Sequence, residues 1–276
     1  MTEDSQRNPD STFLQGLFGL KDEVAVIVGG AGRIGRALCQ ALASAGANIA
    51  IVDMNGASAE QLATEINASG GENRAWAIPR DVSKADELAD AVADVQRACG
   101  PPSILINSAQ FRGTGFYSSS PENDQTEAWR QVIDVNLTAV FHTCQAFGKK
   151  MIENGQGKII NLASTYGVVS PDPRVYGDSG VNSPPAYGAS KAAVIQLTRY
   201  LAVHWREHNI RVNCLVPGGV FDNQGDEFVR EYERRTPLGR MAKAEDYQGA
   251  VLFMASSASD YMTGAAVTVD GGWTAW

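Results

Sequence analysis

Seven short apolar runs recur along the chain, separated by polar or amphipathic stretches. Continuous apolar runs of this length are typical of parallel strands buried on both faces. We therefore predict strands over residues 24–28, 48–53, 74–79, 103–107, 158–162, 210–216 and 266–270. Between them, the patterns predict helices over residues 34–45, 58–68, 84–98, 126–150, 192–205 (opened by Tyr187), 226–235 and 243–256.

The alternation of strand and helix continues through the chain without an internal break. It predicts an α/β fold, a three-layer Rossmann fold with a doubly wound, seven-stranded parallel sheet. We expect one domain over residues 18–276, preceded by a flexible tail over 1–17 because the first residues are polar. The segment 221–240 is charged and irregular, and we predict a mobile flap there. The apolar tail 273–276 is expected to pack on its own core or on a neighbouring subunit.

The net charge of the chain favours small molecules as its binding partners. A net charge of −8 argues against a nucleic-acid surface and an anionic membrane surface. No apolar run reaches the length of a spanning helix, and no apolar signal core stands at the start. The four cysteines are scattered, which favours reduced, buried thiols and a cytoplasmic protein.

A glycine-rich turn follows the first predicted strand and opens the first predicted helix. Gly30, Gly32 and Gly35 fit the spacing G-x-G-x-x-G. Glycines let the backbone approach a pyrophosphate, and the N-terminus of the helix offers N–H donors to it. This strand–turn–helix context predicts a dinucleotide site, although a plain strand-to-helix turn is the alternative.

An acid, Asp53, ends the second strand about twenty residues after the glycines, where a ribose 2′-hydroxyl would be accepted. A carboxylate there repels a 2′-phosphate, so NAD is favoured over NADP, and Met54 adds no cation to reverse this preference. Arg33, inside the glycine turn, is in reach of a 2′-phosphate and leaves NADP open. A helix cap is the alternative role of Asp53.

Further polar residues stand where predicted strands end. Asp81 and Val82 are placed to border an adenine ring, although Asp81 or Ser83 could simply cap the next helix. Asn136 lies inside the predicted helix 126–150, and asparagine is a weak helix former. It is either exposed, or buried with a partner or a role.

Tyr187 and Lys191 are four residues apart and would lie on one face of a helix. Tyrosine has a pKa of about 10, and a nearby ammonium favours the phenolate. Such a pair can exchange a proton with an alcohol or a carbonyl. Alone it is also compatible with two exposed side chains.

Taken together and in this order, the motifs resemble the short-chain dehydrogenases/reductases of the compact, single-domain kind. The resemblance runs from about Gly19 to Gly272 and includes Pro217-Gly218 and Val269-Asp-Gly-Gly272. It implies a catalytic tetrad of Asn136, Ser164, Tyr187 and Lys191. It further implies that the cofactor binds residues Gly29, Gly32, Arg33, Ile34, Gly35, Asp53, Met54, Asp81, Val82, Asn107, Ser108, Ala109, Tyr187, Lys191, Pro217, Gly218 and Val220.

The resemblance also assigns roles within the tetrad. Tyr187 would be the general base in oxidation and the general acid in reduction, and Lys191 would lower its pKa and bind the nicotinamide ribose. Ser164 would hold the substrate oxygen, and Asn136 would support a water that relays protons to Lys191. Members of the family are commonly tetramers, so a homotetramer or homodimer is expected.

Three departures from the family pattern concern the cofactor turn and the substrate pocket. Val28 and Arg33 replace the usual threonine and middle glycine of the turn, and Asn107-Ser108-Ala109-Gln110 replaces Asn-Asn-Ala-Gly. Ser164 and Tyr187 are also further apart than usual, and the extra residues lie in 169–185. This insertion should wall the pocket, so we predict substrate contacts, with surface positions as the alternative, for Tyr166, Arg174, Tyr176 and Asn182.

The resemblance is strongest to members that act on sugars and polyols, and a hydrophilic substrate fits the polar loops 112–123 and 222–234. Two alternatives stay open: a 3-oxoacyl-carrier-protein reductase, against which Asp53 and the net charge argue, and a catalytically silent dinucleotide-binding regulator. A zinc site at His204 and His208 is disfavoured because Trp205 occupies the place where the general-base glutamate would follow and no third ligand stands nearby, so no metal is expected.

Overall fold

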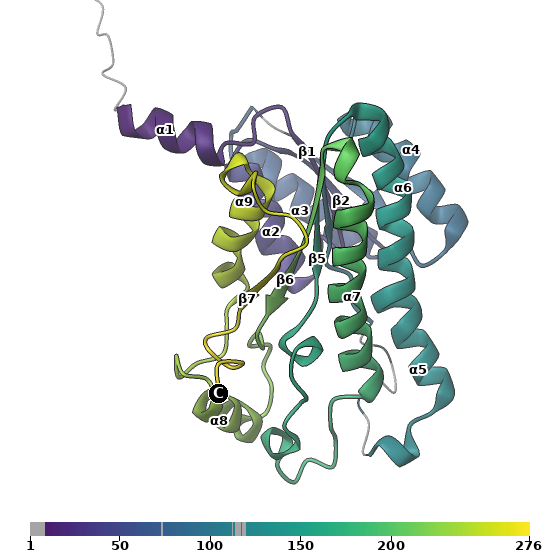
Figure 1. The fold of residues 1–276 in the computed structure, drawn as a ribbon, viewed down its shortest axis with the longest axis vertical. Helices are drawn as coiled ribbons and strands as arrows, with labels where there is room; N and C mark the ends of the chain where they lie inside the picture. The colour runs from purple at the N-terminus through teal and green to yellow at the C-terminus, as the bar shows by residue number, and fades with distance from the viewer. Residues whose placement is uncertain (1–8, 73, 112, 114–116, 118–119) are drawn as a thin grey trace, which may run out of the picture.

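The computed structural model describes residues 9–72, 74–111, 113, 117 and 120–276. A parallel sheet crosses its centre in the strand order β3-β2-β1-β4-β5-β6-β7 (Figure 1). The strands are β1 Val24–Val28, β2 Asn48–Asp53, β3 Ala75–Pro79, β4 Ile104–Asn107, β5 Gly157–Leu162, β6 Ile210–Pro217 and β7 Ala266–Val269. All seven predicted strands are therefore confirmed, with ends shifted by at most one residue.

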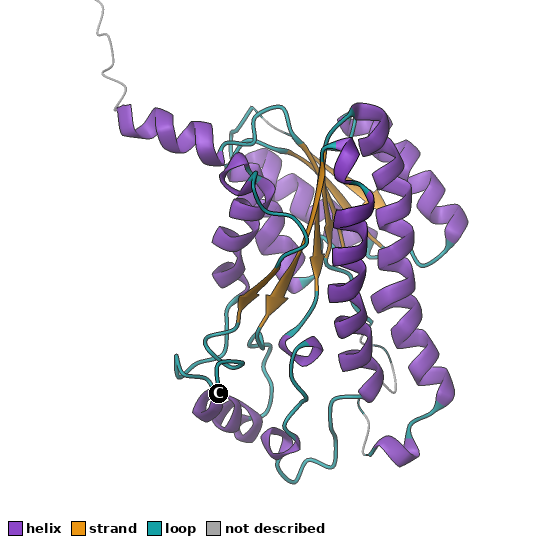
Figure 2. Ribbon diagram, viewed as in Figure 1, coloured by secondary structure: helices purple, strands orange, loops and turns teal. Residues whose placement is uncertain are grey.

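Helices cover both faces of this sheet (Figure 2). They are α1 Pro9–Phe18, α2 Arg33–Ser44, α3 Gly56–Ala68, α4 Ala85–Cys99, α5 Thr126–Ile133, α6 Ala139–Asn154, α7 Pro185–His204, α8 Asp226–Arg235 and α9 Gln248–Ala255. Apolar side chains of α2, α3 and α9 form one core with the sheet, and those of α4, α6 and α7 form the other. The predicted three-layer fold is confirmed.

The order of the strands places a ligand site. β1 pairs with β2 on one side and with β4 on the other, so successive strands leave β1 in opposite directions. In such sheets ligands bind beyond the carboxyl ends of the strands, at this switch point. The loops at that end, with α8 and the C-terminus, gather at the bottom of Figure 1.

Two predicted helices differ from the observed ones. The helix predicted over 126–150 is interrupted by a π-helical turn, η2, over Asp134–Thr138, and this turn holds Asn136. A π turn inside an α-helix often marks a functional position. The helix predicted over 243–256 begins instead with a 3₁₀ turn, η6, over Ala244–Tyr247, and continues as α9.

The predicted N-terminal tail also differs. Residues 1–8 lie outside the described part of the chain, but residues 9–17 belong to helix α1. The end of α1 is held to the domain by Ser257, whose hydroxyl donates to the carbonyl of Leu17 at 3.0 Å. The expected division into a tail and one domain over 18–276 stays a prediction.

A small third cluster closes the carboxyl end of the sheet. It joins Val175 and Tyr176 of the insertion to Tyr232 of α8, Met241 and Trp273. The rings of Tyr232 and Trp273 stack with centroids 4.1 Å apart, so the start of the C-terminal tail packs on its own domain as expected. Trp276 is 81% exposed on its own domain, so its packing on a neighbouring subunit stays a prediction.

Three further predictions concern the cysteines, membrane-spanning helices and the segment around α8. The four cysteines are free, and burial raises the pKa of Cys144 to about 12, which keeps it a neutral thiol. Among the described residues, no helix is both long and apolar enough to cross a membrane. Helix α8 coincides with the helix predicted over 226–235, whereas the mobility of the flap around it stays a prediction.

Candidate active site

The glycine turn between β1 and α2 brings backbone close to backbone. Gly29 has φ +74°, and a Cβ there would lie 2.6 Å from the backbone nitrogen of Ala109. A Cβ on Gly35 would collide with the carbonyl of Gly29. Only glycine therefore allows α2 to start this close to the sheet. The N-terminus of α2 opens onto the cavity, where a pyrophosphate would bind.

Asp53 lies at the end of β2 and faces the same turn. Its carboxylate accepts hydrogen bonds from the backbone N–H groups of Ala31 at 3.0 Å and Asn55 at 2.9 Å. Arg33 is paired with Asp222, an acid from the segment 221–240. The glycine turn therefore has an acid at the end of β2 on one side and an acid-paired arginine on the other.

The predicted cofactor residues meet on the walls of one cavity of about 1100 Å³, with one exception. The wall contains Gly29, Gly32, Arg33, Ile34, Gly35, Asp53, Met54, Asp81, Val82, Ser108, Ala109, Tyr187, Lys191, Pro217, Gly218 and Val220. This fits a dinucleotide, because a glycine turn, the acid at the end of β2 and other strand-end residues lie along one continuous surface.

Asn107 is the exception, and the structure corrects its predicted role. Its side chain is 2% exposed and does not line the cavity. Its Nδ2 donates to Oδ1 of Asn161 at 2.9 Å, and its Oδ1 accepts from Thr143 at 2.8 Å. Buried amides need such partners. Asn107 therefore links β4 to β5 and α6 within the core.

Ser164, Tyr187 and Lys191 share the wall of the cavity beyond the glycine turn. Tyr187 and Lys191 stand one turn apart on α7, and Lys191 Nζ lies 5.9 Å from the centre of the Tyr187 ring. Lys191 is 2% exposed, and its ammonium donates to the carbonyl of Leu162 at 2.9 Å. A buried ammonium next to a half-buried phenol is an arrangement suited to proton transfer.

Ser164 is positioned by close packing between a 3₁₀ turn, η3 (Thr165–Gly167), and α7. Its hydroxyl accepts from the N–H of Tyr166 at 3.2 Å. A Cβ on Gly167 would lie 2.7 Å from the backbone carbon of Lys191, so glycine lets this turn rest directly on α7. The hydroxyl of Ser164 and the side chains of α7 are thereby set in one place.

Asn136 is buried within the π turn, which settles the question the sequence left open. Its Oδ1 accepts from the N–H of Phe111 at 2.8 Å, while its Nδ2 is buried without a protein hydrogen-bond partner among the described residues. It lies behind the cavity wall, to which its neighbour Val135 contributes. Asn136 therefore has both a structural partner and a donor left over.

The insertion contributes only part of the predicted substrate contacts. Tyr166 and Tyr176 line the cavity, but Arg174 and Asn182 do not. Arg174 is 80% exposed and is turned back onto Asp172 at 2.9 Å. Burial raises the pKa of Tyr166 and of Tyr176, so both are neutral phenols that offer hydroxyl groups.

Several residues of the substrate end were missed by the sequence predictions. They follow β4, lie in the insertion or belong to the segment around α8: Gln110, Phe111, Tyr117, Ser179, Ser183, Gln224, Glu227, Phe228, Tyr232 and Met241. The position of Gln110 and Phe111 directly after a strand was a usable signal. The segment around α8 was predicted as a flap, but only the fold shows which of its side chains face the cavity.

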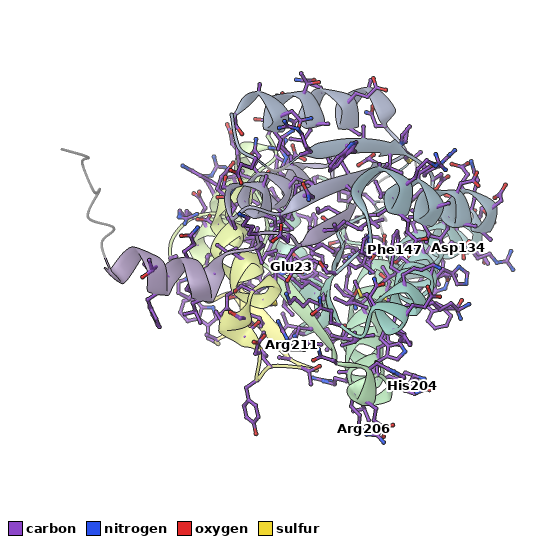
Figure 3. The ribbon with its side chains drawn as sticks, turned by 90° about the horizontal axis from the view of Figure 1, so that it is seen from above. Glu23, Asp134, Phe147, His204, Arg206 and Arg211 are labelled. Carbon is purple, nitrogen blue, oxygen red and sulfur yellow. The ribbon has the colours of Figure 1, made fainter. Side chains whose placement is uncertain are left out.

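His142 lies on α6, His204 ends α7, and His208 ends the 3₁₀ turn Arg206–His208. No group of three or more potential protein ligands occurs among the described residues. His204 ends α7 and stacks on Tyr200 with ring centroids 5.7 Å apart. It lies with Arg206 at the rim of the molecule (Figure 3).

Comparison with known proteins agrees with this geometry. A family model described as enoyl-(acyl carrier protein) reductase matches residues 29–274. The chain is 35% identical over 266 residues to galactitol 2-dehydrogenase (L-tagatose-forming) of Cereibacter sphaeroides, covering 94% of this chain and 98% of the relative. It is 38% identical over 269 residues to galactitol 2-dehydrogenase of Rhizobium johnstonii, with the same coverage.

Solved structures give the same result. A gluconate 5-dehydrogenase from Burkholderia cenocepacia, in complex with NADP and tartrate, superposes with a TM-score of 0.83 at 30% identity. The match covers 95% of this chain and 99% of that one. The chain belongs to the short-chain dehydrogenase/reductase family and is an oxidoreductase that acts on alcohol groups.

Proposed function

We propose that this protein interconverts a secondary alcohol and a ketone on a neutral polyol or sugar, with NAD as cofactor. The observation that carries the proposal is the shared cavity, which has a glycine cradle with Asp53 at one end and Ser164, Tyr187 and Lys191 at the other. The galactitol dehydrogenases among its relatives support a polyol substrate.

The residues present allow the following proton chemistry. Ser164 donates a hydrogen bond to the reacting oxygen, and Tyr187 takes the hydroxyl proton during oxidation and returns it during reduction. The Lys191 ammonium stabilises the phenolate electrostatically. Asn136 Nδ2, which is buried without a protein partner among the described residues, is proposed to hold a water that relays protons to Lys191. When bound, NAD supplies the hydride acceptor, and the protein supplies orientation.

Asp53 is proposed to select NAD. A 2′-phosphate would meet the carboxylate at the end of β2, while Arg33 is already engaged by Asp222. Like charges placed in contact cost several kcal/mol. Because the neighbouring gluconate 5-dehydrogenase structure holds NADP, the preference within this family needs its own test.

Replacing Asp53 with Ala should reduce the preference for NAD over NADP by about tenfold or more, a change of roughly 1.4 kcal/mol. The measurement is the dissociation constant of each cofactor by calorimetry. Glu60→Ala, which removes an acid on α3 outside the cavity, is the control. Equal affinity of the wild type for both cofactors would remove this role from Asp53.

The charges around the cavity favour a neutral substrate over an anionic one. Arg33 is paired with Asp222, and Arg80 is paired with Asp94 at 2.7 Å. Lys191 is proposed to stabilise the phenolate of Tyr187. Glu227 of α8 lines the cavity and has no basic partner among the described residues. Within the described part of the chain, no lining cation is left to bind a carboxylate or a phosphate of the substrate.

Glu227→Gln should therefore raise activity on a sugar acid relative to a neutral polyol. The ratio of the two kcat/KM values should increase about three- to tenfold. Asp226→Asn is the matched control, because it removes a charge from the same turn of α8 outside the cavity. An unchanged ratio would show that Glu227 does not discriminate by charge.

The experiment for the proposed function is a substrate screen. Neutral polyols, sugars, sugar acids and nucleotide sugars are each mixed with NAD, and NADH absorbance is recorded. Activity strongest on neutral polyols supports the proposal. Activity only on acyl-thioesters with NADPH would favour the reductase alternative suggested by the description of the family model. Cofactor binding without turnover of any compound would favour a silent regulator.

We propose that the enzyme works as a homotetramer or homodimer, as the family resemblance implies, and in the cytoplasm, where its four free cysteines would stay reduced. Light scattering at micromolar concentration distinguishes these states from a monomer.

A further inference from the structure

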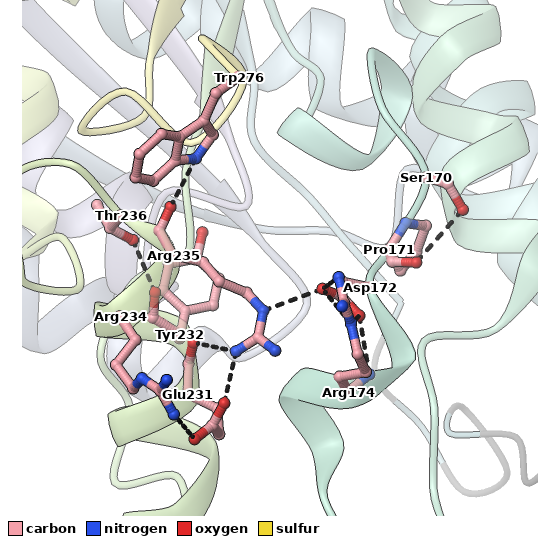
Figure 4. A network of polar contacts seen from close by, with 10 residues as sticks. All are labelled: Ser170, Pro171, Asp172, Arg174, Glu231, Tyr232, Arg234, Arg235, Thr236 and Trp276. Atoms are coloured by element: carbon pink, nitrogen blue, oxygen red, sulfur yellow. Dashed lines mark hydrogen bonds and ion pairs between the residues drawn. The ribbon is translucent and has the colours of Figure 1, made fainter.

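The insertion between β5 and α7 is joined to α8 by a partly buried ion pair. Asp172 accepts a hydrogen bond from Nε of Arg235 at 2.9 Å, across 63 positions of the sequence (Figure 4). Arg235 is held in turn by Glu231, whose carboxylate lies 2.6 Å from Nη1. The side chains of Asp172 and Arg235 are 20% and 25% exposed. This pair is more shielded than an ordinary surface ion pair.

Local contacts hold both residues of the pair in place. The carboxylate of Asp172 also accepts from the backbone N–H of Arg174 at 2.9 Å, and it caps the 3₁₀ turn η4 over Pro173–Tyr176. The Arg174 and Arg235 guanidiniums hold the pKa of Asp172 well below its usual range, so it is charged at physiological pH. Arg235 ends α8, and its carbonyl accepts from Nε1 of Trp276 at 3.2 Å.

The elements joined by the pair carry the wall of the substrate end. Tyr176 closes η4, and its ring lies 5.3 Å from that of Phe228 on α8. Tyr166 packs against the apolar cluster that contains Tyr176 and Tyr232. The ring of Tyr166 meets that of Tyr187 edge-on, with centroids 6.4 Å apart. A continuous series of contacts therefore runs from Asp172 and Arg235 to the proposed catalytic tyrosine.

We propose that Asp172 and Arg235 are positioning residues, which clamp the insertion onto α8 and fix the wall formed by Tyr166 and Tyr176 opposite the reacting carbon. Neither residue lines the cavity, so neither touches the substrate. The clamp determines how the polyol is oriented, rather than how the proton or hydride moves. Its kinetic consequence rests on the proposed polyol activity, whereas its structural consequence does not.

The test compares variants that break the link with variants that spare it. Asp172→Asn removes the charge of the acceptor and so weakens the link, and Arg235→Met removes the donor. Arg174→Ala and Arg234→Met are the matched controls. Arg174 contacts the same carboxylate but is 80% exposed and belongs to the insertion itself. Arg234 stands beside Arg235 and pairs with Glu231 at 3.1 Å, not with Asp172.

Hydrogen–deuterium exchange is measured on each full-length variant with NAD bound, together with steady-state kinetics on the best polyol. The link-breaking variants should exchange faster over 165–183, and their KM for the polyol should rise roughly three- to tenfold. Their kcat should change less than KM, and their affinity for NAD should stay at the wild-type value. Both controls should behave as wild type.

Each outcome decides between the clamp and an incidental contact. Wild-type exchange and wild-type KM in Asp172→Asn and Arg235→Met would overturn the proposal. Equal effects in Arg174→Ala would do the same, because that variant keeps the link. If one link-breaking variant fails to fold, the other decides. If the wild type oxidises no polyol, the proposed function fails, and the exchange measurement alone decides on the clamp.

Discussion

Tyr187→Phe is expected to lower kcat by about 10²- to 10⁴-fold, the range that general acid–base catalysis contributes. The substitution removes only the hydroxyl and keeps the ring that packs edge-on against Tyr166. Lys191 keeps its hydrogen bond to the carbonyl of Leu162. The pocket should therefore retain its shape, and the loss should appear in the chemical step.

The measurement is steady-state turnover of the best polyol, with NAD affinity determined separately by calorimetry. The affinity for NAD should remain within about twofold of the wild type, a difference of only ~0.4 kcal/mol in binding free energy. Tyr200→Phe is the matched control, because it lies on the same helix but is 62% exposed and outside the cavity. A Tyr187→Phe enzyme with wild-type kcat would exclude Tyr187 as the proton-transfer group.

Gly35→Ala should weaken NAD binding roughly five- to 100-fold. The added Cβ would collide with the carbonyl of Gly29 and approach Cα of Gly30 to 2.8 Å, and backbone atoms cannot rotate away. Overpacking of this kind typically costs about 1–3 kcal/mol. The glycine turn must open to relieve the collision, and the N-terminus of α2 then moves from its position beside the cavity.

Calorimetric titration with NAD measures this effect, and thermal unfolding reports whether the domain itself is intact. Gly249→Ala is the control, because a Cβ in that part of α9 would meet no atom within 4 Å. Wild-type affinity in a folded Gly35→Ala protein would mean that the cofactor does not use this turn.

The sequence predicted the frame of the site well, for a physical reason. Strands buried on both faces appear as continuous apolar runs, and parallel strands end at one edge of the sheet. Residues that follow those runs, such as Asp53, Asp81 and Ser164, therefore had to lie near one another. Their place on one cavity wall follows from topology and needs no knowledge of side-chain packing.

Asn107 shows where this reasoning fails. It stands at the end of a strand like the others, but successive side chains of a strand point to opposite faces. Its partners, Thr143 and Asn161, are 36 and 54 positions away in the sequence. Only the packing of α6 and β5 against β4 reveals that the amide is needed in the core.

Two of the substrate contacts predicted in the insertion were wrong for a related reason. Arg174 and Asn182 looked suitable for binding a hydrophilic substrate, yet Arg174 is held by Asp172, which itself is bound by Arg235 of α8. Likewise, Asn136 was recognised as unusual in a helix, but the π turn that holds it and its bond with the N–H of Phe111 are visible only in the structure. Tertiary partners, rather than local pattern, decide these positions.

The most direct test of the central claim is product analysis of wild-type turnover. The enzyme is incubated with NAD and the neutral polyol on which it is most active, and NADH and the carbonyl product are quantified together. We predict equal amounts of NADH and of a ketose, and formation of both at least about 10²-fold slower with Tyr187→Phe. A protein that binds NAD yet yields no ketose from any neutral polyol would contradict the account.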